Sequence, residues 1–402
     1  MAPRTETTTI VTTEARSKMD LEPSTNDDDG AVQLQAQPEP MEIIWINVFK
    51  IFTIHVMALY GLYLALFEAK WMTLNFTIFY IVCSGLSVTA GAHRLWSHRS
   101  YRTFISCCMH VHFSLFFVFF LRGATIFFFL TLFCAAIFYI VCSGLSVTAG
   151  AHRLWSHRSY KAKLPLRIIL MLFNCMAGQN DIYDWVRDHR VHHKYSETDA
   201  DPHNVNRGFF FAHVGWLMCR KHSEVTKKGK AIDCSDVAND PVVKFQTRYH
   251  IPMTILFCFI VPTVVPYRYW GESRWNAFFV AAILRWVFQL NSTWLVNSAA
   301  HIWGQKPYDK NISPAENFLV SFLAIGEGFH NYHHTFPWDY STSELGWKLN
   351  ISTMFIDLMA KIGWAYDLRK PTREMIQQRV TRTGDGSHPS QRHHHHHHDN
   401  EY

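Results

Sequence analysis

The stretch Ala-His-Arg-Leu-Trp-Ser-His-Arg-Ser at residues 151–159 places His152 and His157 directly after a long apolar run. Histidine is the commonest metal-binding side chain, and apolar runs of this length are typical of membrane spans. The pair therefore indicates a metal site where the chain leaves a membrane. The two histidines are five residues apart, which is about 140° around an ideal helix of 3.6 residues per turn. We therefore expect the helix to end between them.

Two later clusters have the form His-x-x-His-His, and one more histidine stands between them. Helical residues three and four apart lie close to one face, so each cluster can direct its imidazoles to one side. Imidazole suits iron, zinc, copper and nickel. Nine such donors are too many for one ion, so the pattern predicts two metals. The nine are His152, His157, His189, His192, His193, His301, His330, His333 and His334.

Other patterns exclude some classes of protein. The metalloprotease motif HExxH is absent, and a net charge of +6 is too modest to indicate nucleic-acid binding. The nine cysteines are scattered and give no disulfide framework. Single histidines outside the clusters are interpreted as ordinary polar residues: His55, His110, His112, His203, His213, His222 and His250.

Long apolar blocks, rich in the chain's 31 phenylalanines, indicate membrane-spanning helices. Each block can cross a hydrocarbon core of about 30 Å. Leu164–Gln179 is shorter, and we expect it to lie at the membrane interface. Arg285 lies inside one block and should face protein or water rather than lipid. The four predicted spans lie within Ile51–Phe67, Trp71–Ala92, Ile251–Pro266 and Trp275–Val296.

An internal repeat complicates this order. Ile78–Tyr101 and Ile137–Tyr160 are identical over 24 residues, so the first stretch has a second copy with His93 and His98. An exact repeat indicates a recent duplication or an assembly artefact rather than two selected copies. The duplicated region, 93–151, adds two apolar runs. Two extra crossings leave both copies on the same side of the membrane.

Three regions follow from composition. Residues 1–40 are polar and acidic and are predicted to be a disordered tail. Residues 41–370 hold the membrane domain, whose basic segment Asn180–His250 should be cytosolic. Residues 371–402 form a C-terminal tail with the run His393–His398, which resembles an affinity tag.

The motifs together resemble those of the membrane acyl-CoA desaturases, in particular the stearoyl-CoA (delta-9) and insect pheromone-gland enzymes. The matching motifs are His-Arg-Leu-Trp-Ser-His, Asp188-His-Arg-Val-His-His, Asn297-Ser-Ala-Ala-His301 and Gly328-Phe-His-Asn-Tyr-His-His334. The resemblance covers roughly residues 41–385 without the inserted repeat. It implies an all-α integral membrane fold, with a four-helix transmembrane bundle under a helical cytosolic cap that holds a di-iron site.

The resemblance also implies roles for individual residues. The nine histidines would bind two iron ions (Fe²⁺) and form the catalytic centre, and Asn297 would hold a metal-bound water. A bent, narrow, apolar tunnel would place one C–C bond beside the metals. Residues implied at the bend and near the CoA head group are Gln179, Asn180, Trp185, Arg187, Asp188, Arg220, Lys221, Thr293 and Trp294.

The implied reaction is the introduction of a cis double bond into a saturated or monounsaturated fatty acyl-CoA, for lipid or pheromone synthesis. It would use O₂ and electrons from NADH through cytochrome b5 reductase and cytochrome b5. The chain has no His-Pro-Gly-Gly haem motif, so the donor would be a separate protein. We expect a multi-pass protein of the endoplasmic reticulum with cytosolic termini. A histidine-box hydroxylase and a non-catalytic membrane metal-binding protein are the alternatives.

Spacing decides between the two copies of the first stretch. His157 precedes His189 by 32 residues, which is the separation in the family, whereas His98 precedes it by 91. We therefore predict that His152 and His157 bind metal, and that His93 and His98 do not. The resemblance also implies that the helix before His152 closes the far end of the tunnel. Ile140 and Gly144 occupy this stretch, twelve and eight residues before His152, and a glycine there leaves room for a longer acyl chain.

Overall fold

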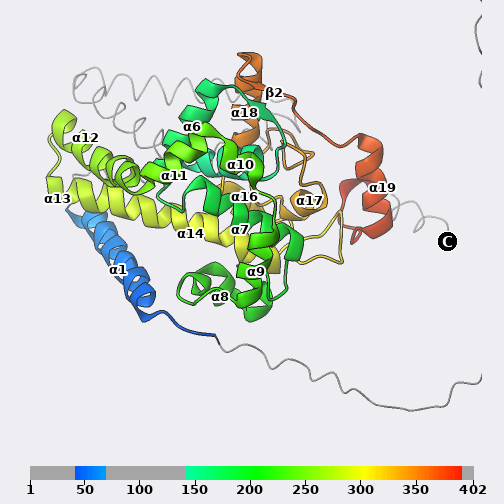
Figure 1. The fold of residues 1–402 in the computed structure, drawn as a ribbon, viewed down its shortest axis with the longest axis horizontal. Coiled ribbons are helices and arrows are strands. Elements are labelled where there is room, and N and C mark those ends of the chain that lie inside the picture. Colours follow the sequence, from blue (N-terminus) through cyan, green and yellow to red (C-terminus); the bar gives the residue numbers. More distant parts are fainter. Residues whose placement is uncertain (1–40, 69–140, 392–402) are drawn as a thin grey trace, which may run out of the picture. The chain divides into compact units, whose positions relative to one another are not determined.

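The computed structural model describes residues 41–68 and 141–391 (Figure 1). The chain divides into two compact units, Met1–Pro40 and Met41–Tyr402, and the described residues belong to the second. The predicted N-terminal tail, the span Trp71–Ala92, the first copy of the repeat and the run Phe104–Leu121 lie outside the described residues. In the part that is described, the structure is almost entirely helical.

Three described helices are long and apolar enough to cross a membrane: Trp45–Phe67, Pro241–Tyr269 and Arg274–Ile302. The first is α1. The second comprises α11 (Pro241–Thr254), η5 (Ile255–Ile260) and α12 (Val261–Trp270), and the third comprises α13 (Arg274–Asn276), η6 (Ala277–Leu284), α14 (Arg285–Asn297) and α15 (Ala299–Ile302). Three of the four predicted spans thus correspond to helices. The last two extend beyond the apolar blocks because polar residues at one end of each continue the helix.

The membrane helices pack closely. In Figure 1, α1 meets the third long helix near α13, where the Trp275 indole donates a hydrogen bond to the Tyr60 hydroxyl (3.1 Å). Gly61 faces the backbone of Phe279, where any side chain would clash with the carbonyl oxygen. Arg285 is buried, and its guanidinium donates to the carbonyl oxygens of Cys258 (3.1 Å) and Met176 (3.3 Å). The prediction that Arg285 faces protein is confirmed.

The remaining described elements are shorter and lie between and after these helices in the sequence. They are η2 (Ser146–Ser156), β1 (Lys161–Ala162), α6 (Leu164–Ala177), α7 (Ile182–Tyr195), η3 (Val205–Arg207), α8 (Phe209–His213), η4 (Gly215–Leu217), α9 (Ser223–Ala231), α10 (Ser235–Asn239), α16 (Phe318–Leu323), α17 (His330–Thr335), α18 (Ile351–Lys361), β2 (Ala365–Tyr366) and α19 (Arg373–Thr383). The short apolar helix expected at Leu164–Gln179 is α6.

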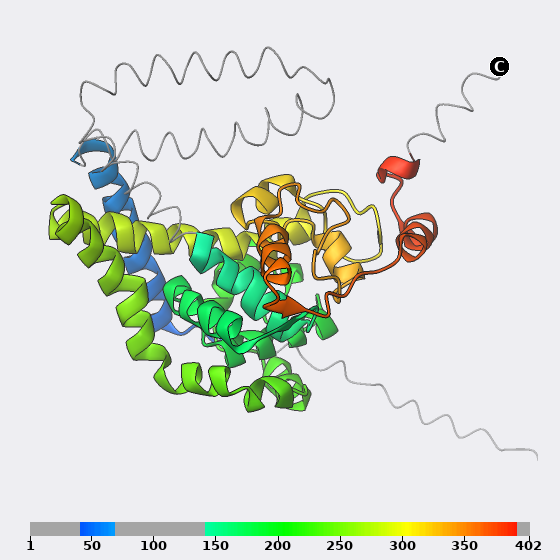
Figure 2. The ribbon, with the colours of Figure 1, turned by 90° about the horizontal axis from the view of Figure 1, so that it is seen from above.

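One hydrophobic core joins η2, α6, α7 and α18. Leu166, Leu170, Val186 and Ile356 are fully buried in it. The strands β1 and β2 pair antiparallel and connect the end of η2 to the end of α18, an arrangement that can be followed in Figure 2. This core fixes η2 against α7, and both helices bear metal-site histidines.

The folded chain continues past residue 370, where the sequence pattern predicts the start of a tail. Helix α19 buries Val380 against Tyr308, Tyr332 and Phe336. The sequence gives little warning of this contact, because α19 is mostly polar and buries a single residue of its own.

Candidate metal centre

The first histidine, His152, lies on η2, a π-helix that runs from Ser146 to Ser156, and the second, His157, is the residue that caps the C-terminal end of this helix. The amide of His157 donates to the carbonyl oxygen of His152 at 3.1 Å, which is the i→i+5 bond of a π-helix. Residues five apart therefore lie one turn apart on the same face, and the two ring centroids are 4.9 Å apart. The expectation that the helix ends between His152 and His157 is confirmed, because η2 ends at Ser156, and its last i→i+5 bond brings both rings to one side.

The two His-x-x-His-His clusters lie on α7 and α17, and each divides its histidines in the same way. The pair four residues apart joins one group, whereas the histidine between them joins the other. On α7 the pair is His189 and His193, as the helical spacing predicts. On α17 the pair is His330 and His334.

One group therefore contains five imidazoles whose ligand atoms all lie within 4.8 Å of one another. Nε2 of His152 is 2.9 Å from Nε2 of His333, which is 3.0 Å from Nε2 of His193. The Nε2 atoms of His157 and His189 are 2.9 Å apart. The members of this five-histidine group are His152, His157, His189, His193 and His333.

The other group contains four imidazoles. Nε2 of His330 lies 3.0 Å from Nε2 of His301 and 3.1 Å from Nε2 of His334. His192 completes this four-histidine group. The structure thus brings all nine predicted histidines together and separates them into two sets of donors.

These distances fit metal ions. Imidazole nitrogens bind a transition metal at about 2.1 Å, so two of them at a right angle would be about 3.0 Å apart. All of the distances between Nε2 atoms quoted above lie close to this value. Burial and neighbouring imidazoles lower the pKa values of His157, His189, His193, His330, His333 and His334 well below the ordinary range. These rings are neutral, which is the form that binds a metal.

Three carboxylates each contact the Nδ1 atom of one imidazole, whereas Nε2 of the same ring faces the histidine groups. Nδ1 of His152 is 2.9 Å from Oε2 of Glu327, and Nδ1 of His192 is 2.9 Å from Oδ1 of Asp201. Nδ1 of His301 is 3.0 Å from Oε1 of Glu197. Such partners fix the tautomer and leave Nε2 free to bind a metal.

None of these three carboxylates is predicted from the sequence. Glu327 forms a Glu-x-x-His pair with His330, a local signal that could have revealed it. Glu197 and Asp201 follow the second cluster within the acidic stretch Glu-Thr-Asp-Ala-Asp. Asp201 also accepts a hydrogen bond from the backbone amide of His203 (2.9 Å), so His203, interpreted above as an ordinary residue, lies against the four-histidine group.

Two arginines of the histidine motifs hold together the elements that bear the histidines. Arg153, with 1% of its surface exposed, donates to Glu327 (2.7 Å) and to the Thr353 hydroxyl (3.0 Å). Arg190 donates to the carbonyl oxygens of Trp155 (2.7 Å) and Ser156 (3.1 Å). Arg190 therefore satisfies acceptors at the end of η2 and joins η2 to α7.

A cavity lies between the two histidine groups and the third long helix. His152 and His189 border it from one group, and His192 and His330 from the other. Its remaining wall is mostly apolar and includes Gly144, Val147, Phe288, Val296, Leu323 and Ile325. An apolar cavity bordered by nitrogen donors suits a long hydrocarbon held beside metals.

Comparison with known proteins agrees with this geometry. The family model described as fatty acid desaturase matches residues 125–346, a stretch that includes all nine histidines. This chain belongs to the fatty acid desaturase family.

Three curated relatives illustrate the similarity. Stearoyl-CoA desaturase 5 of Bos taurus is 62% identical over 252 residues, which cover 63% of this chain and 75% of the relative. Acyl-CoA Delta-9 desaturase of Acheta domesticus is 49% identical over 353 residues, covering 88% and 82%. Acyl-CoA Delta(11) desaturase of Trichoplusia ni is 46% identical over 383 residues, covering 95% and 89%.

Within this desaturase the predicted tunnel residues are only partly brought together. Trp185 and Thr293 line the cavity, as does Asn297. Gln179 joins the first two, since it accepts from the Trp185 indole (3.1 Å) and donates to the Thr293 hydroxyl (3.1 Å). Trp294 does not line the cavity. It is buried beside Val214 and Leu290 on the other side of α14.

The polar residues predicted near the CoA head group lie in separate places. Arg187 pairs with Asp184 (2.7 Å) and with Asp188 (3.4 Å), and Asp188 pairs with Lys221. This ion-pair cluster joins α7 to the segment just before α9. Arg220 instead pairs with Glu42 at 3.1 Å, and Asn180 is exposed in the turn before α7.

The described residues include the histidines of the second copy of the repeated stretch but not those of the first. His152 and His157 both belong to the five-histidine group, whereas His93 and His98 lie outside the described residues. The match to the family model begins at residue 125 and therefore contains only the second copy.

Proposed function

We propose that this protein, an acyl-CoA desaturase, introduces a cis double bond into a saturated or monounsaturated fatty acyl-CoA at two iron ions held by its nine histidines. The supporting observation is the pair of histidine groups that converge on one apolar cavity. The family and its relatives support the activity. Iron, the double-bond geometry and the electron donor belong to the proposal.

The reaction removes two hydrogens from adjacent methylenes. One O₂, two electrons and two protons are consumed with them, and two waters are formed. No side chain is a strong enough oxidant for an unactivated C–H bond, and iron with O₂ supplies that chemistry when bound. The nine imidazoles would hold the ions, with His152, His157, His189, His193 and His333 on one side and His192, His301, His330 and His334 on the other.

The remaining residues would position the acyl chain and the ligands. Glu327, Asp201 and Glu197 keep their histidines in one tautomer. The Asn297 amide borders the cavity beside His192 and His330, where it could hold a water against the four-histidine group. The hydrogen-bonded chain of Trp185, Gln179 and Thr293 fixes the cavity wall, and with it the C–C bond that stops beside the metals.

We further propose that the CoA phosphates bind near Arg187, Lys221 and Arg220, because cations suit phosphate recognition. Binding there would require the CoA to compete with Asp188 and Glu42 for these cations. The electrons would come from cytochrome b5 and its NADH-dependent reductase. The proposed location is the endoplasmic reticulum membrane with cytosolic termini, which places the basic cap in the cytosol.

The test is expression of the full chain in desaturase-deficient yeast, with analysis of lipids for double bonds. Unsaturated chains should appear and should disappear in His330→Ala. The matched control is His222→Ala, because His222 lies outside both histidine groups. Hydroxylated chains would overturn the assigned reaction. Iron analysis of the purified protein should give two ions per chain, and bound zinc alone would overturn the assigned metal.

A further inference from the structure

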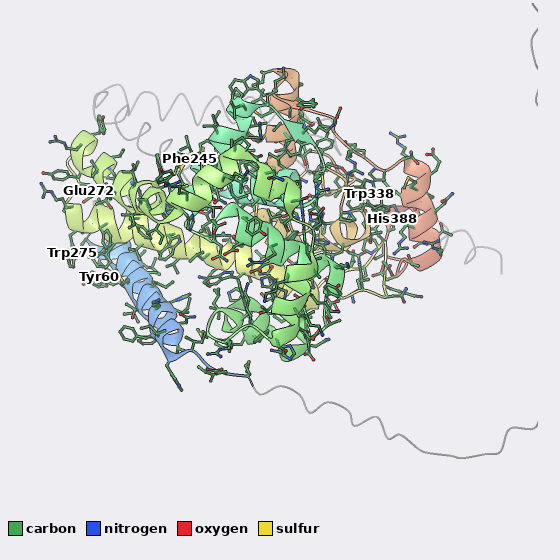
Figure 3. All side chains as sticks on the ribbon, viewed as in Figure 1. Tyr60, Phe245, Glu272, Trp275, Trp338 and His388 are labelled. Atoms are coloured by element: carbon green, nitrogen blue, oxygen red, sulfur yellow. The ribbon has the colours of Figure 1, made fainter. Side chains whose placement is uncertain are left out.

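The C-terminal segment 373–391, here called the strap, lies against the loop Lys306–Lys310, here called the shelf. The strap consists of α19 and the residues that follow it to Gln391. Figure 3 labels Trp338 and His388 beside α19. Trp338 packs against the cluster that buries Val380, and the His388 ring lies 5.6 Å from the ring of Tyr308 on the shelf.

Backbone hydrogen bonds join the strap to the shelf at both ends. The amide of Lys310 donates to the carbonyl oxygen of Thr383 (2.8 Å), and the amide of Asp385 donates to that of Lys306 (3.2 Å). The amide of Lys306 in turn donates to the Asp385 carboxylate (2.6 Å), and the Thr383 hydroxyl donates to the carbonyl oxygen of Tyr308 (2.8 Å). These bonds specify one register.

An ion pair and a close backbone approach reinforce this register. The Arg379 guanidinium pairs with the carboxylate of Asp309, which is 5% exposed. Gly384 ends α19 directly against the carbonyl oxygen of Pro307, and a side chain at this position would clash with it. Glycine is therefore required here for space.

The shelf binds the side chain of Asn331, which lies within the histidine cluster His330, His333 and His334 on α17. Asn331 is fully buried, and its amide oxygen accepts from the amides of Tyr308 (2.9 Å) and Asp309 (3.1 Å). Its amide nitrogen donates to the carbonyl oxygens of Asp309 (2.8 Å) and Pro314 (2.9 Å). The side chain thus makes four hydrogen bonds, three to the shelf and one to Pro314, which follows the shelf in the chain.

Asn331 stands next to His330 on α17, and His333 and His334 follow it within the same six-residue helix. So short a helix has little stability of its own, because helix nucleation costs more than so few hydrogen bonds return. Its orientation must come from tertiary contacts. The shelf supplies such contacts on one side, and the strap holds the shelf.

We propose that the strap is a positioning element of the metal centre. It acts through Asp309 and Asn331 to hold the three histidines of α17 in place. This inference rests on the proposed two-metal function. Because α17 contributes to both histidine groups, loosening of the strap weakens both metal sites. The cavity wall formed by Trp185 and Thr293 comes from other helices and stays intact.

The test compares Arg379→Gln with Arg382→Gln. Arg382 lies three residues later on the same helix and is exposed. In Arg379→Gln we expect the dissociation constant for iron to rise about 10-fold, the low end for residues that support metal ligands. The Mössbauer spectrum of the bound iron should broaden, while the dissociation constant for acyl-CoA stays at the wild-type value. Arg382→Gln should match the wild type in all three measurements.

Two further sets of variants separate positioning from general damage. If Arg379 and Asp309 act as a pair, the double variant Arg379→Gln/Asp309→Asn should lose no more iron affinity than the more affected single variant. Arg379→Lys should restore part of the affinity, because it keeps the charge. Gly384→Ala disturbs the same contact, because its new Cβ would clash with the backbone of Pro307, and it should reproduce the loss of iron affinity.

The outcomes are distinguishable. If the wild-type protein binds no metal, the proposed function fails before the strap is tested. If the wild type binds two irons and Arg379→Gln binds them with the same affinity and spectrum, the positioning role is overturned. If acyl-CoA affinity falls in parallel with iron affinity, the strap supports the fold as a whole, and the proposal is also overturned.

Discussion

Oε2 of Glu327 lies 2.9 Å from Nδ1 of His152, and Oε1 of the same carboxylate accepts a 2.7 Å hydrogen bond from Arg153. Burial raises the pKa of Glu327, but the charge of Arg153 and the hydrogen bonds from both partners outweigh it and lower the pKa to about 2. Glu327 is therefore ionised at neutral pH. It holds the His152 ring with Nε2 directed to the five-histidine group.

Glu327→Gln should weaken metal binding at the five-histidine group. The amide keeps the shape of the side chain but loses the negative charge that fixes the His152 tautomer and neutralises buried Arg153. Iron affinity or activity should fall about 10- to 100-fold, as for other residues that orient metal ligands. Iron titration of the purified variant measures the loss.

The matched control is Glu374→Gln, an exposed residue on α19. It should bind iron like the wild type. Equal iron affinity in Glu327→Gln and the wild type would show that the ion pair only stabilises the fold.

The choice between the two copies of the first stretch can be tested by paired substitution. We expect His152→Ala to abolish iron binding at the five-histidine group and all desaturation. His93→Ala should retain both, because the 32-residue spacing to His189 belongs to the second copy. Iron content and lipid analysis measure the two effects. Loss of iron in His93→Ala with retention in His152→Ala would reverse the assignment.

Much of the site follows from sequence because its spacing is local. The i, i+4 pairs His189/His193 and His330/His334 each share a group, as any helix requires. The first pair, His152 and His157, could not be placed this way. Its geometry depends on a π-helix, and the partners that hold η2 in place lie far along the chain, as the 174 residues between Arg153 and Glu327 illustrate.

The residues that support the histidines could not be predicted either, because their partners also lie far along the chain. The contact between Asp309 and Arg379 links residues 70 apart, and α19 has one buried residue. Composition cannot distinguish such a helix from a solvated tail. Trp294 is the opposite case. It is predicted beside the cavity together with its neighbour Thr293, but only Thr293 lines the cavity, and Trp294 is buried in a different cluster.

The width of the cavity at Gly144 predicts acyl-chain preference. Gly144 borders the cavity, and an added Cβ would lie 2.9 Å from Cδ1 of Ile325. Gly144→Val should fill this space and shift the ratio of kcat/KM values toward shorter acyl-CoA by about 10-fold or more, the effect of a methylene or two in an apolar pocket. Competition between acyl-CoA substrates of different length measures the ratio.

Ile325→Ala in the same background provides the control. It removes the atom that the new side chain meets and should restore part of the preference for longer chains. An unchanged preference in Gly144→Val would show that the acyl chain does not reach this end of the cavity.

Asp236 links the end of η2 to α7, and its ion pairs should make the stability of the fold depend on pH. It accepts hydrogen bonds from Arg158 (2.7 Å) and Arg190 (2.9 Å). Partial burial raises its pKa, but these two arginines outweigh the burial and lower the pKa below its ordinary value. A carboxylate with a lowered pKa stabilises the folded state above its unfolded pKa, and this stabilisation is lost as the pH falls.

Asp236→Asn should therefore lower the free energy of unfolding at pH 7 by about 1 kcal/mol, a value already reduced for the exposure of the pair. The difference from the wild type should shrink as the pH falls below about 4, where the unfolded aspartate is protonated. Denaturant unfolding in detergent between pH 7 and pH 3 measures it. Asp367→Asn is the matched control, because Asp367 pairs with Lys161 while both side chains are more than half exposed. It should leave stability close to that of the wild type. A difference at Asp236 that does not decrease at all between pH 7 and pH 3 would contradict the charge-based explanation.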